Sequence, residues 1–273
     1  MSRYASRARP LLGTFVEIRA SGSARTIEAS VDAAYHAIER VHCLMSVHDP
    51  ASELSRLNGT AHRSALAVHP WTFAVLRRAR MLFQSTGGAF DPAFGTPVPS
   101  CGHRPTFGDV ALLPGRLVRF ARPLVLDLGG IAKGFAVDRA IACLRRVGAA
   151  GAIVNAGGDL AVFGPEPILI HVRHPADPGV LLPLGTLRDG AVATSAGYFR
   201  DPAAAVVDPF TAKRCAERCS VSVIAPDCIT ADGLTKGLVL RGGRAAASLA
   251  RERAQGIIVS ADGTLSRWNG GLA

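Results

Sequence analysis

The sequence predicts an α+β fold with mixed sheets, because strand-like and helix-like segments follow one another without regular alternation. Two observations support this prediction. Apolar residues recur at helical spacing over 27–46, and apolar runs of strand length gather between 152 and 225. With 273 residues, of which 48% are hydrophobic, the chain can bury a large core, so we expect one bilobal domain covering 1–273.

The first half of the chain is predicted to begin with a strand and continue with two helices. Residues 11–20 alternate like a strand, and the apolar positions of 27–46 would lie on one face of a helix. A second helix is expected from Pro70 to the pair Gly87 and Gly88, since glycine suits the left-handed end of a helix.

A strand, a glycine turn and a helix are expected in the middle of the chain. Residues 124–128 form an apolar run, Gly129 and Gly130 follow, and a helix should run from about Ala132 to Val147 before Gly148 stops it. Further strands are expected over 152–156, 160–163, 168–172 and 221–225, and a last helix over 230–240.

The formal net charge of +10 is carried mostly by arginine, as only three of the 31 basic residues are lysines. Positive charge attracts nucleic acids and acidic membranes, but the arginines are scattered and few aromatics lie among them. No known nucleic-acid motif and no stretch long enough to span a bilayer is found. We therefore expect no nucleic-acid partner and no stable membrane insertion, whereas an anionic dinucleotide could benefit from the charge.

Six irregularly spaced cysteines indicate thiols in a reducing compartment rather than a zinc site. The close pair Cys215 and Cys219 has no second pair to complete four ligands. The basic N-terminus runs directly into strand-like sequence instead of an apolar signal core, so a cytoplasmic location is expected.

The junction of strand, glycines and helix at Gly129 and Gly130 suits a pyrophosphate. Glycines let a backbone approach closely, and the free N–H groups of a helix start can bind phosphate oxygens. Alone, such a turn is more often a plain connection, and the run Gly157-Gly158-Asp159 would alone be a hairpin or bulge.

Several short motifs occur together along the chain, and their combination is more specific than any one of them. They are Leu44-Met45-Ser46, 52–58, Gly88-Ala89-Phe90-Asp91-Pro92, 126–134, 155–159, Ala193-Thr194-Ser195, Val207-Asp208-Pro209 and Ala231-Asp232-Gly233-Leu234. In this order they resemble the ApbE family of FAD:protein FMN transferases, over roughly residues 11 to 265.

The resemblance implies a two-lobed fold that holds FAD in the cleft between the lobes, with magnesium beside the pyrophosphate. It further implies that FMN passes to a threonine of a target protein. The threonine hydroxyl would attack the flavin-side phosphorus and AMP would leave, so the site must neutralise phosphate charge and take up a proton.

The resemblance also assigns site residues. Met45 would pack against the flavin nucleotide and Asp91 would contact the nucleotide, although alone they could be a core methionine and a turn aspartate. Lys133 would contact the cofactor, or else be a solvated residue of a first helical turn. The cofactor-binding residues implied are Met45, Asp91, Gly129, Gly130, Lys133, Gly157, Gly158, Asp159, Thr194, Ser195 and Val207, and the metal ligands implied are Gly130, Ala132 and Asp232.

The chain departs from the family's pattern at Lys236, where a threonine metal ligand is typical four residues after the aspartate. An ammonium there would repel magnesium but could sit against the pyrophosphate, as a phosphate-loop lysine does. We therefore interpret Lys236 as a catalytic residue that partly replaces the metal. The alternative is a pair between Asp232 and Lys236 on a solvated helix face, worth only about 0.3 to 0.5 kcal/mol.

The second departure is Ala205, where many family members carry the histidine thought to act as the base. All eight histidines precede residue 175, so only folding could supply a substitute. His171 and His174 are the candidate substitutes, with His171 assigned to catalysis. The resemblance also places Tyr198, Arg200 and Asp208 near the site, and Asp208 is counted as catalytic.

Three functions follow from these features. The first is FMN transfer from FAD to a target threonine. The alternative is a binding module that has lost catalysis through Ala205 and Lys236, or a hydrolase that cleaves FAD with water. A basic nucleic-acid-binding protein is a third hypothesis that the scattered arginines hardly favour.

Overall fold

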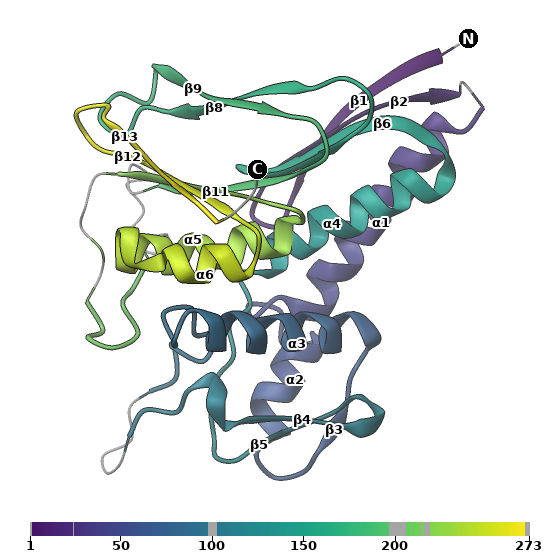
Figure 1. The fold of residues 1–273 in the computed structure, drawn as a ribbon. Coiled ribbons are helices and arrows are strands. Elements are labelled where there is room, and N and C mark those ends of the chain that lie inside the picture. Colours follow the sequence, from purple (N-terminus) through teal and green to yellow (C-terminus); the bar gives the residue numbers. More distant parts are fainter. Residues whose placement is uncertain are drawn as a thin grey trace.

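The computed structural model describes residues 2–23, 25–97, 103–196, 206–213, 215 and 219–270. It confirms the α+β class. An eight-stranded sheet carries a two-stranded sheet on one face and helices on the other, and a second group of helices with a three-stranded sheet lies beyond those helices (Figure 1).

The large sheet joins strands from both ends of the chain in the order β1-β2-β6-β7-β10-β11-β12-β13. Each described strand pair in the molecule is antiparallel, where mixed sheets were expected. The strands are β1 (Ser2–Leu11), β2 (Thr14–Ser23), β6 (Ala149–Ala156), β7 (Asp159–Phe163), β10 (Gly190–Ala196), β11 (Ser220–Ala225), β12 (Gln255–Val259) and β13 (Leu265–Asn269).

The predicted helices are confirmed, with ends set by the expected local signals. Pro70 opens one helix, while Gly87 and Gly88 follow its end with φ of 56° and 82°. Gly148, with φ of 96°, ends another. The helices are α1 (Ile27–Met45), α2 (Glu53–Thr60), α3 (Pro70–Ser85), α4 (Ala132–Val147), α5 (Cys228–Arg241) and α6 (Ala246–Arg251).

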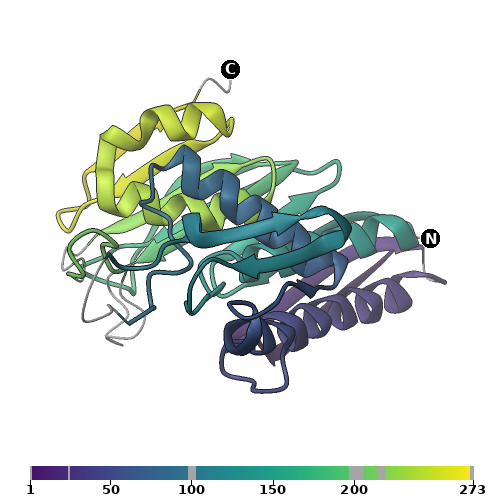
Figure 2. The ribbon, with the colours of Figure 1, turned by 90° about the horizontal axis from the view of Figure 1, so that it is seen from below.

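Two small sheets complete the fold. The pair of β8 (Ile168–Arg173) and β9 (Leu181–Leu187) covers one face of the large sheet. The other sheet has the order β3-β5-β4, and seen from below its β4–β5 hairpin lies over α3 (Figure 2). Its strands are β3 (Leu66–Ala67), β4 (Val110–Leu113) and β5 (Leu117–Phe120), and short 3₁₀ helices cover Phe107–Asp109, Pro114–Arg116 and Gly242–Ala245.

The predicted strand over 11–20 is wrong at its start, because a hairpin turn interrupts it. Leu12 and Gly13 have φ of 57° and 71°, so the chain reverses there and β1 pairs with β2. Strand β1 was not predicted, since its arginines and small residues lack a clear alternation.

The predicted strand over 124–128 is also wrong. Leu124, Leu126 and Leu128 are buried, but no strand in the described part of the chain pairs with the segment. Its backbone polar groups instead bond to loops and side chains: Asn58 bonds both the N–H and the C=O of Leu126 at 2.9 Å, and Thr96 bonds Val125. An apolar run indicates that a segment is buried, and both a strand and an extended loop can be buried.

Successive side chains along β7 point to opposite faces of the large sheet. Ala161 and Phe163 belong to the main core shared with α1, α4 and α5, whereas Val162 belongs to a smaller core under β8 and β9. Asp159 has the same parity as Ala161 and therefore faces the helices. In Figure 1, α4 and α5 lie between the large sheet and α3. No helix in the described part of the chain is long and apolar enough to cross a membrane.

Candidate functional site

Two partly exposed lysines pair with two buried carboxylates where β7, α4 and α5 come together. Lys133, in the first turn of α4, donates to Asp159 at the start of β7. Lys236 lies one turn after Asp232 on α5 and donates to its Oδ1 at 2.5 Å and to its backbone oxygen at 3.1 Å. We call these four residues the lysine–aspartate cluster. It brings together three motifs that lie up to a hundred residues apart.

Close packing of α4 against α5 positions the cluster. A Cβ at Gly134 would lie 2.4 Å from the carbonyl oxygen of Cys228, so only glycine allows this approach. The N–H of Gly134 donates to Asp232 Oδ2 at 3.2 Å. The first turn of α4 therefore holds the second oxygen of the carboxylate whose first oxygen binds Lys236.

The charges in the cluster depend on one another. Burial raises the pKa of Asp159 to about 6, and the nearby Asp232 carboxylate adds to the rise while Lys133 opposes it. Burial also tends to raise the pKa of Asp232, but the ammonium groups of Lys236 and Lys133 outweigh it and the pKa falls below its usual value. Burial lowers the pKa of Lys133, and the Asp159 and Asp232 carboxylates raise it by more. Two carboxylates thus share two ammonium groups.

Asp138 is a site-supporting residue that the sequence analysis missed. From α4 it accepts the N–H groups of Cys228 and Ile229 at 2.8 and 2.9 Å, which are among the unpaired donors at the start of α5. Its partners lie about ninety residues away, so no local pattern marks it. Asp138 holds α5, and hence Asp232 and Lys236, in register with α4.

We expect the stability of the fold to depend on the protonation of Asp138. Burial raises its pKa from 3.8 to about 7, although the two N–H bonds oppose the shift. The raised pKa means that its stabilising contribution is complete below the unfolded value and is lost as the pH rises to about 7. In Asp138→Asn, the fall in the free energy of unfolding between pH 5 and 7.5, measured by urea denaturation, should be smaller than in the wild type. An unchanged pH dependence would show that Asp138 does not carry the raised pKa.

A hydroxyl group of β10 lies beside α5. Ser195 donates to Thr235 Oγ1 at 2.9 Å, and Thr235 donates to the backbone oxygen of Asp232 at 2.7 Å. Ser195 therefore lies on the α5 side of the sheet.

Thr194 and Ser222 share a hydrogen bond of 2.9 Å. Thr194 and Ser222 lie on the opposite face, because Val192 and Ile224, two residues away on the same strands, pack in the smaller core under β8 and β9. The structure thus does not bring the predicted site residue Thr194 to the cluster.

The Gly129 and Gly130 turn lies against the end of Lys236. A Cβ at Gly130 would lie 3.2 Å from Lys236 Cε and 3.5 Å from the Phe90 ring. Ala132, the next predicted metal ligand, begins α4 immediately after this turn. The predicted pyrophosphate turn and the divergent lysine are therefore neighbours.

The second glycine pair forms a hairpin turn before Asp159. Gly157 has φ of 65°, and a Cβ there would lie 2.5 Å from Thr14 Oγ1, so a larger residue would collide with the β1–β2 turn. Gly158, with φ of 100°, donates to Asn155 Oδ1 at 3.0 Å. This pair sets the start of β7 and thus the position of Asp159.

Met45 and Asp91 have structural contacts of their own. Met45 is 4% exposed and belongs to the main core. Asp91 accepts the N–H groups of Ala93 and Phe107 at 2.9 and 3.0 Å, and burial raises its pKa. Both observations match the alternative interpretations of a core methionine and a turn aspartate, and contact with a nucleotide stays a prediction.

The loop with Val207 and Asp208 packs against the ends of α3 and α5. Its Phe210 ring lies 3.6 Å from a Cβ built at Gly88, and the guanidinium of Arg241 lies 5.6 Å from the centre of that ring. Asp208 accepts the N–H of Phe210 at 2.8 Å and the hydroxyl of Thr211 at 2.9 Å. These contacts place the loop on the side of the sheet that carries the helices.

His171 and His174 lie on the opposite side of the large sheet from the cluster. In β8, Ile170 and Val172 point into the core shared with the large sheet, so the exposed His171 points away from it. His174 accepts the N–H groups of Ala176 and Asp177 at 3.2 Å in the β8–β9 turn. The structure does not bring either histidine to the lysine–aspartate cluster. The other positions considered, Tyr198, Arg200 and Ala205, lie outside the described residues.

Magnesium does not fit the residues gathered around Asp232. Mg²⁺ requires about six oxygen ligands close to 2.1 Å. Both carboxylate oxygens of Asp232 already bind donors, and the ammonium of Lys236 is one of them. Among the described residues, no group of three or more His, Cys, Asp or Glu could hold a metal ion.

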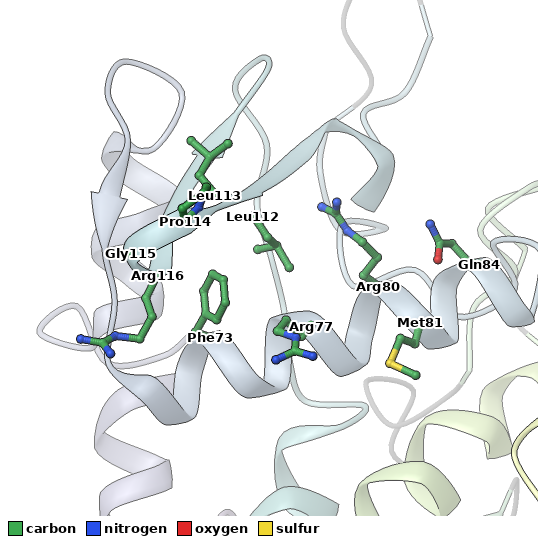
Figure 3. A pocket seen from close by; sticks show the side chains of 10 residues that line it. All are labelled: Phe73, Arg77, Arg80, Met81, Gln84, Leu112, Leu113, Pro114, Gly115 and Arg116. Atoms are coloured by element: carbon green, nitrogen blue, oxygen red, sulfur yellow. The ribbon is translucent and has the colours of Figure 1, made fainter.

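A shallow pocket of about 750 Å³ lies elsewhere, between α3 and the β4–β5 hairpin (Figure 3). Phe73 and Leu112 form part of its wall, and Arg77 and Arg116 contribute charge. It shares no residue with the lysine–aspartate cluster or with the predicted site, so we assign the site to the cluster.

Comparisons with known proteins agree with this assignment. The sequence profile described as the ApbE family matches residues 12–260. The chain is 27% identical to a protein of Treponema pallidum called FAD:protein FMN transferase, over 92% of this chain and 82% of that protein. A protein of Vibrio cholerae with the same name is also 27% identical, over 85% of this chain and 80% of its own length. The crystal structure of the ApbE protein of Thermotoga maritima superimposes with a TM-score of 0.81, at 26% identity over 97% of both chains.

Proposed function

This chain belongs to the ApbE family, and from that premise we propose that it is a flavin transferase that uses FAD as its substrate. It would transfer FMN from FAD to a threonine of a target protein and release AMP. Relatives that match most of the chain carry the name FAD:protein FMN transferase. The threonine acceptor and the roles of individual residues are the proposed part.

The observation that carries the proposal is the meeting of Lys133 and Lys236 beside the Gly129 and Gly130 turn. Glycines let a pyrophosphate approach the backbone, and ammonium groups can neutralise its charge. Because each lysine is held by a buried carboxylate, its position is fixed before the substrate arrives. Preorganised charge of this kind stabilises the transition state of phosphoryl transfer.

The transfer itself exchanges one phosphorus–oxygen bond for another. The threonine oxygen attacks the flavin-side phosphorus and forms the new bond, while the bond from that phosphorus to the bridging oxygen breaks. The bridging oxygen leaves with AMP, and the hydroxyl proton passes to a base. We propose Asp208 as the base, because its loop packs on the side of the sheet that carries α5. His171 lies on the other side.

The proposal is tested by mixing the purified protein with FAD and a protein segment that carries a candidate acceptor threonine. We expect mass spectrometry to find FMN attached to the segment and chromatography to find an equal amount of AMP. The matched control is the same segment with that threonine changed to alanine, which should remain unmodified.

The other outcomes distinguish the alternatives. AMP and free FMN without attachment would indicate FAD hydrolysis. FAD that is bound but stays intact in the presence of several different segments would indicate a binding module. A protein that neither binds nor cleaves FAD would contradict the proposed function.

A further inference from the structure

The Lys236 ammonium donates to two oxygens of a single buried residue, Asp232. Asp232 is 1% exposed, yet it keeps a charge, which in a protein interior requires a nearby partner. Lys236 supplies that partner through both the carboxylate and the backbone oxygen of Asp232. The position beside Asp232 where a cation would bind is thus taken by the chain's own side chain.

The same ammonium group retains capacity for a ligand. A lysine ammonium has three N–H donors, and Asp232 accepts two of those of Lys236. The side chain is 22% exposed, so its end reaches solvent. It also lies against Gly130, at the turn that opens α4. One donor can therefore reach an anion at this turn while the other two stay on Asp232.

The charge of the lysine–aspartate cluster leaves no excess for a second cation. Two ammonium groups face two carboxylates, and the carboxylates of Asp159 and Asp232 are each held by a lysine. A divalent ion at Asp232 would have to displace the Lys236 ammonium or lie beside it. Two positive charges in contact repel strongly in the low dielectric of a protein interior. A variant with a small hydroxyl side chain at 236 would remove this obstacle.

We propose that Lys236 is a built-in cation that replaces a divalent metal ion, so that this protein binds the pyrophosphate of FAD without magnesium. This inference rests on the proposed function, since it concerns the same substrate. It goes beyond the proposed function by naming the residue that determines whether the protein requires a metal ion.

The first test uses the unmodified protein and needs no variant. FAD is titrated while flavin fluorescence is followed, once in EDTA and once in millimolar MgCl₂. We expect the two dissociation constants to agree within about twofold, because a fixed ammonium supplies the charge that a bound ion would otherwise bring. Binding that is lost in EDTA would overturn the inference and leave the proposed function standing. No FAD binding in either condition would overturn the proposed function, and the inference with it.

The second test compares Lys236→Thr with the matched control Arg146→Thr, which removes one positive charge from the exposed last turn of α4. In Lys236→Thr, Asp232 loses its cation, so FAD binding should weaken in EDTA by about tenfold or more and recover in MgCl₂. Mn²⁺ binding, measured by electron paramagnetic resonance without FAD, should appear in this variant and in neither the control nor the wild type. Tight Mn²⁺ binding by the wild type would contradict the proposal, whether or not the variant folds.

Discussion

Gly134→Ala is expected to lower the free energy of unfolding by about 3 kcal/mol, which is the upper range of overpacking costs. A Cβ at this position would lie 2.4 Å from the oxygen and 2.7 Å from the carbon of the Cys228 carbonyl, and both atoms belong to backbone. Backbone cannot move aside as a flexible side chain can, so α4 and α5 would have to separate. Urea denaturation followed by circular dichroism measures the change.

Gly59→Ala provides the matched control for this prediction. Gly59 lies inside α2, and a Cβ there would meet nothing within 4 Å. Alanine is the better helix former, so we expect no loss of stability and a gain of up to about 1 kcal/mol. If both variants had the same stability, the close contact of α4 with α5 would not constrain the fold as described here.

Gly134→Ala should also affect the site, because the N–H of Gly134 binds Asp232. Separation of the helices would lengthen that bond and move Lys236 relative to the Gly130 turn. We therefore expect the affinity for FAD to fall in the variant at temperatures where it is still folded. Retained affinity in a destabilised variant would indicate that the two helices do not need this spacing to bind FAD.

Lys133→Ala is expected to reduce the rate of FMN transfer by about a hundredfold or more, the usual effect of removing one preorganised donor. The ammonium of Lys133 is held by Asp159 and lies in the first turn of α4, where the proposed pyrophosphate site begins. Its removal also leaves the Asp159 carboxylate buried without its cation. Initial rates of flavin attachment, measured by mass spectrometry at saturating FAD, give the effect.

Arg146→Ala is the control on the same helix, since it removes an exposed positive charge in the last turn of α4. Its transfer rate should remain within about twofold of the wild type, because exposed charges far from a site are screened. Lys133→Arg keeps the charge and should retain more activity than Lys133→Ala. Equal rates for the wild type and Lys133→Ala, with both proteins folded, would remove Lys133 from the site.

Local signals were sufficient for the helices and for most of the strands. Helix α4 begins after a glycine turn and ends at Gly148, and both boundaries were predicted from the sequence. The segment 124–128 shows the limit of such signals. Its apolar run resembles a strand, but Asn58 and Thr96 bind its backbone instead of a neighbouring strand. Which partner satisfies a backbone group depends on distant parts of the chain.

In the functional site, too, the sequence marked single residues but not their contacts. The motifs marked Lys133, Asp159 and Asp232, yet nothing in their spacing shows that they meet. The alternative of an Asp232 and Lys236 pair on a solvated helix face is wrong for the aspartate, because α5 packs between β10 and α3 and buries Asp232. His171 follows the strand after the glycine motif in sequence, but the β8–β9 hairpin folds over the other face of the sheet.

By itself, the sequence determined the α+β class, the helices and the family resemblance, because periodicity, glycine and proline positions and short motifs are local properties. Only the tertiary structure decided that Lys236 occupies the oxygens of Asp232, that Asp138 holds the start of α5, and that His171 lies apart from the cluster. The first relation lies within α5 but depends on what buries that helix, and the other two involve residues of different elements. Their energies depend on burial and on which face of the sheet each element covers, and both arise only when the whole chain packs.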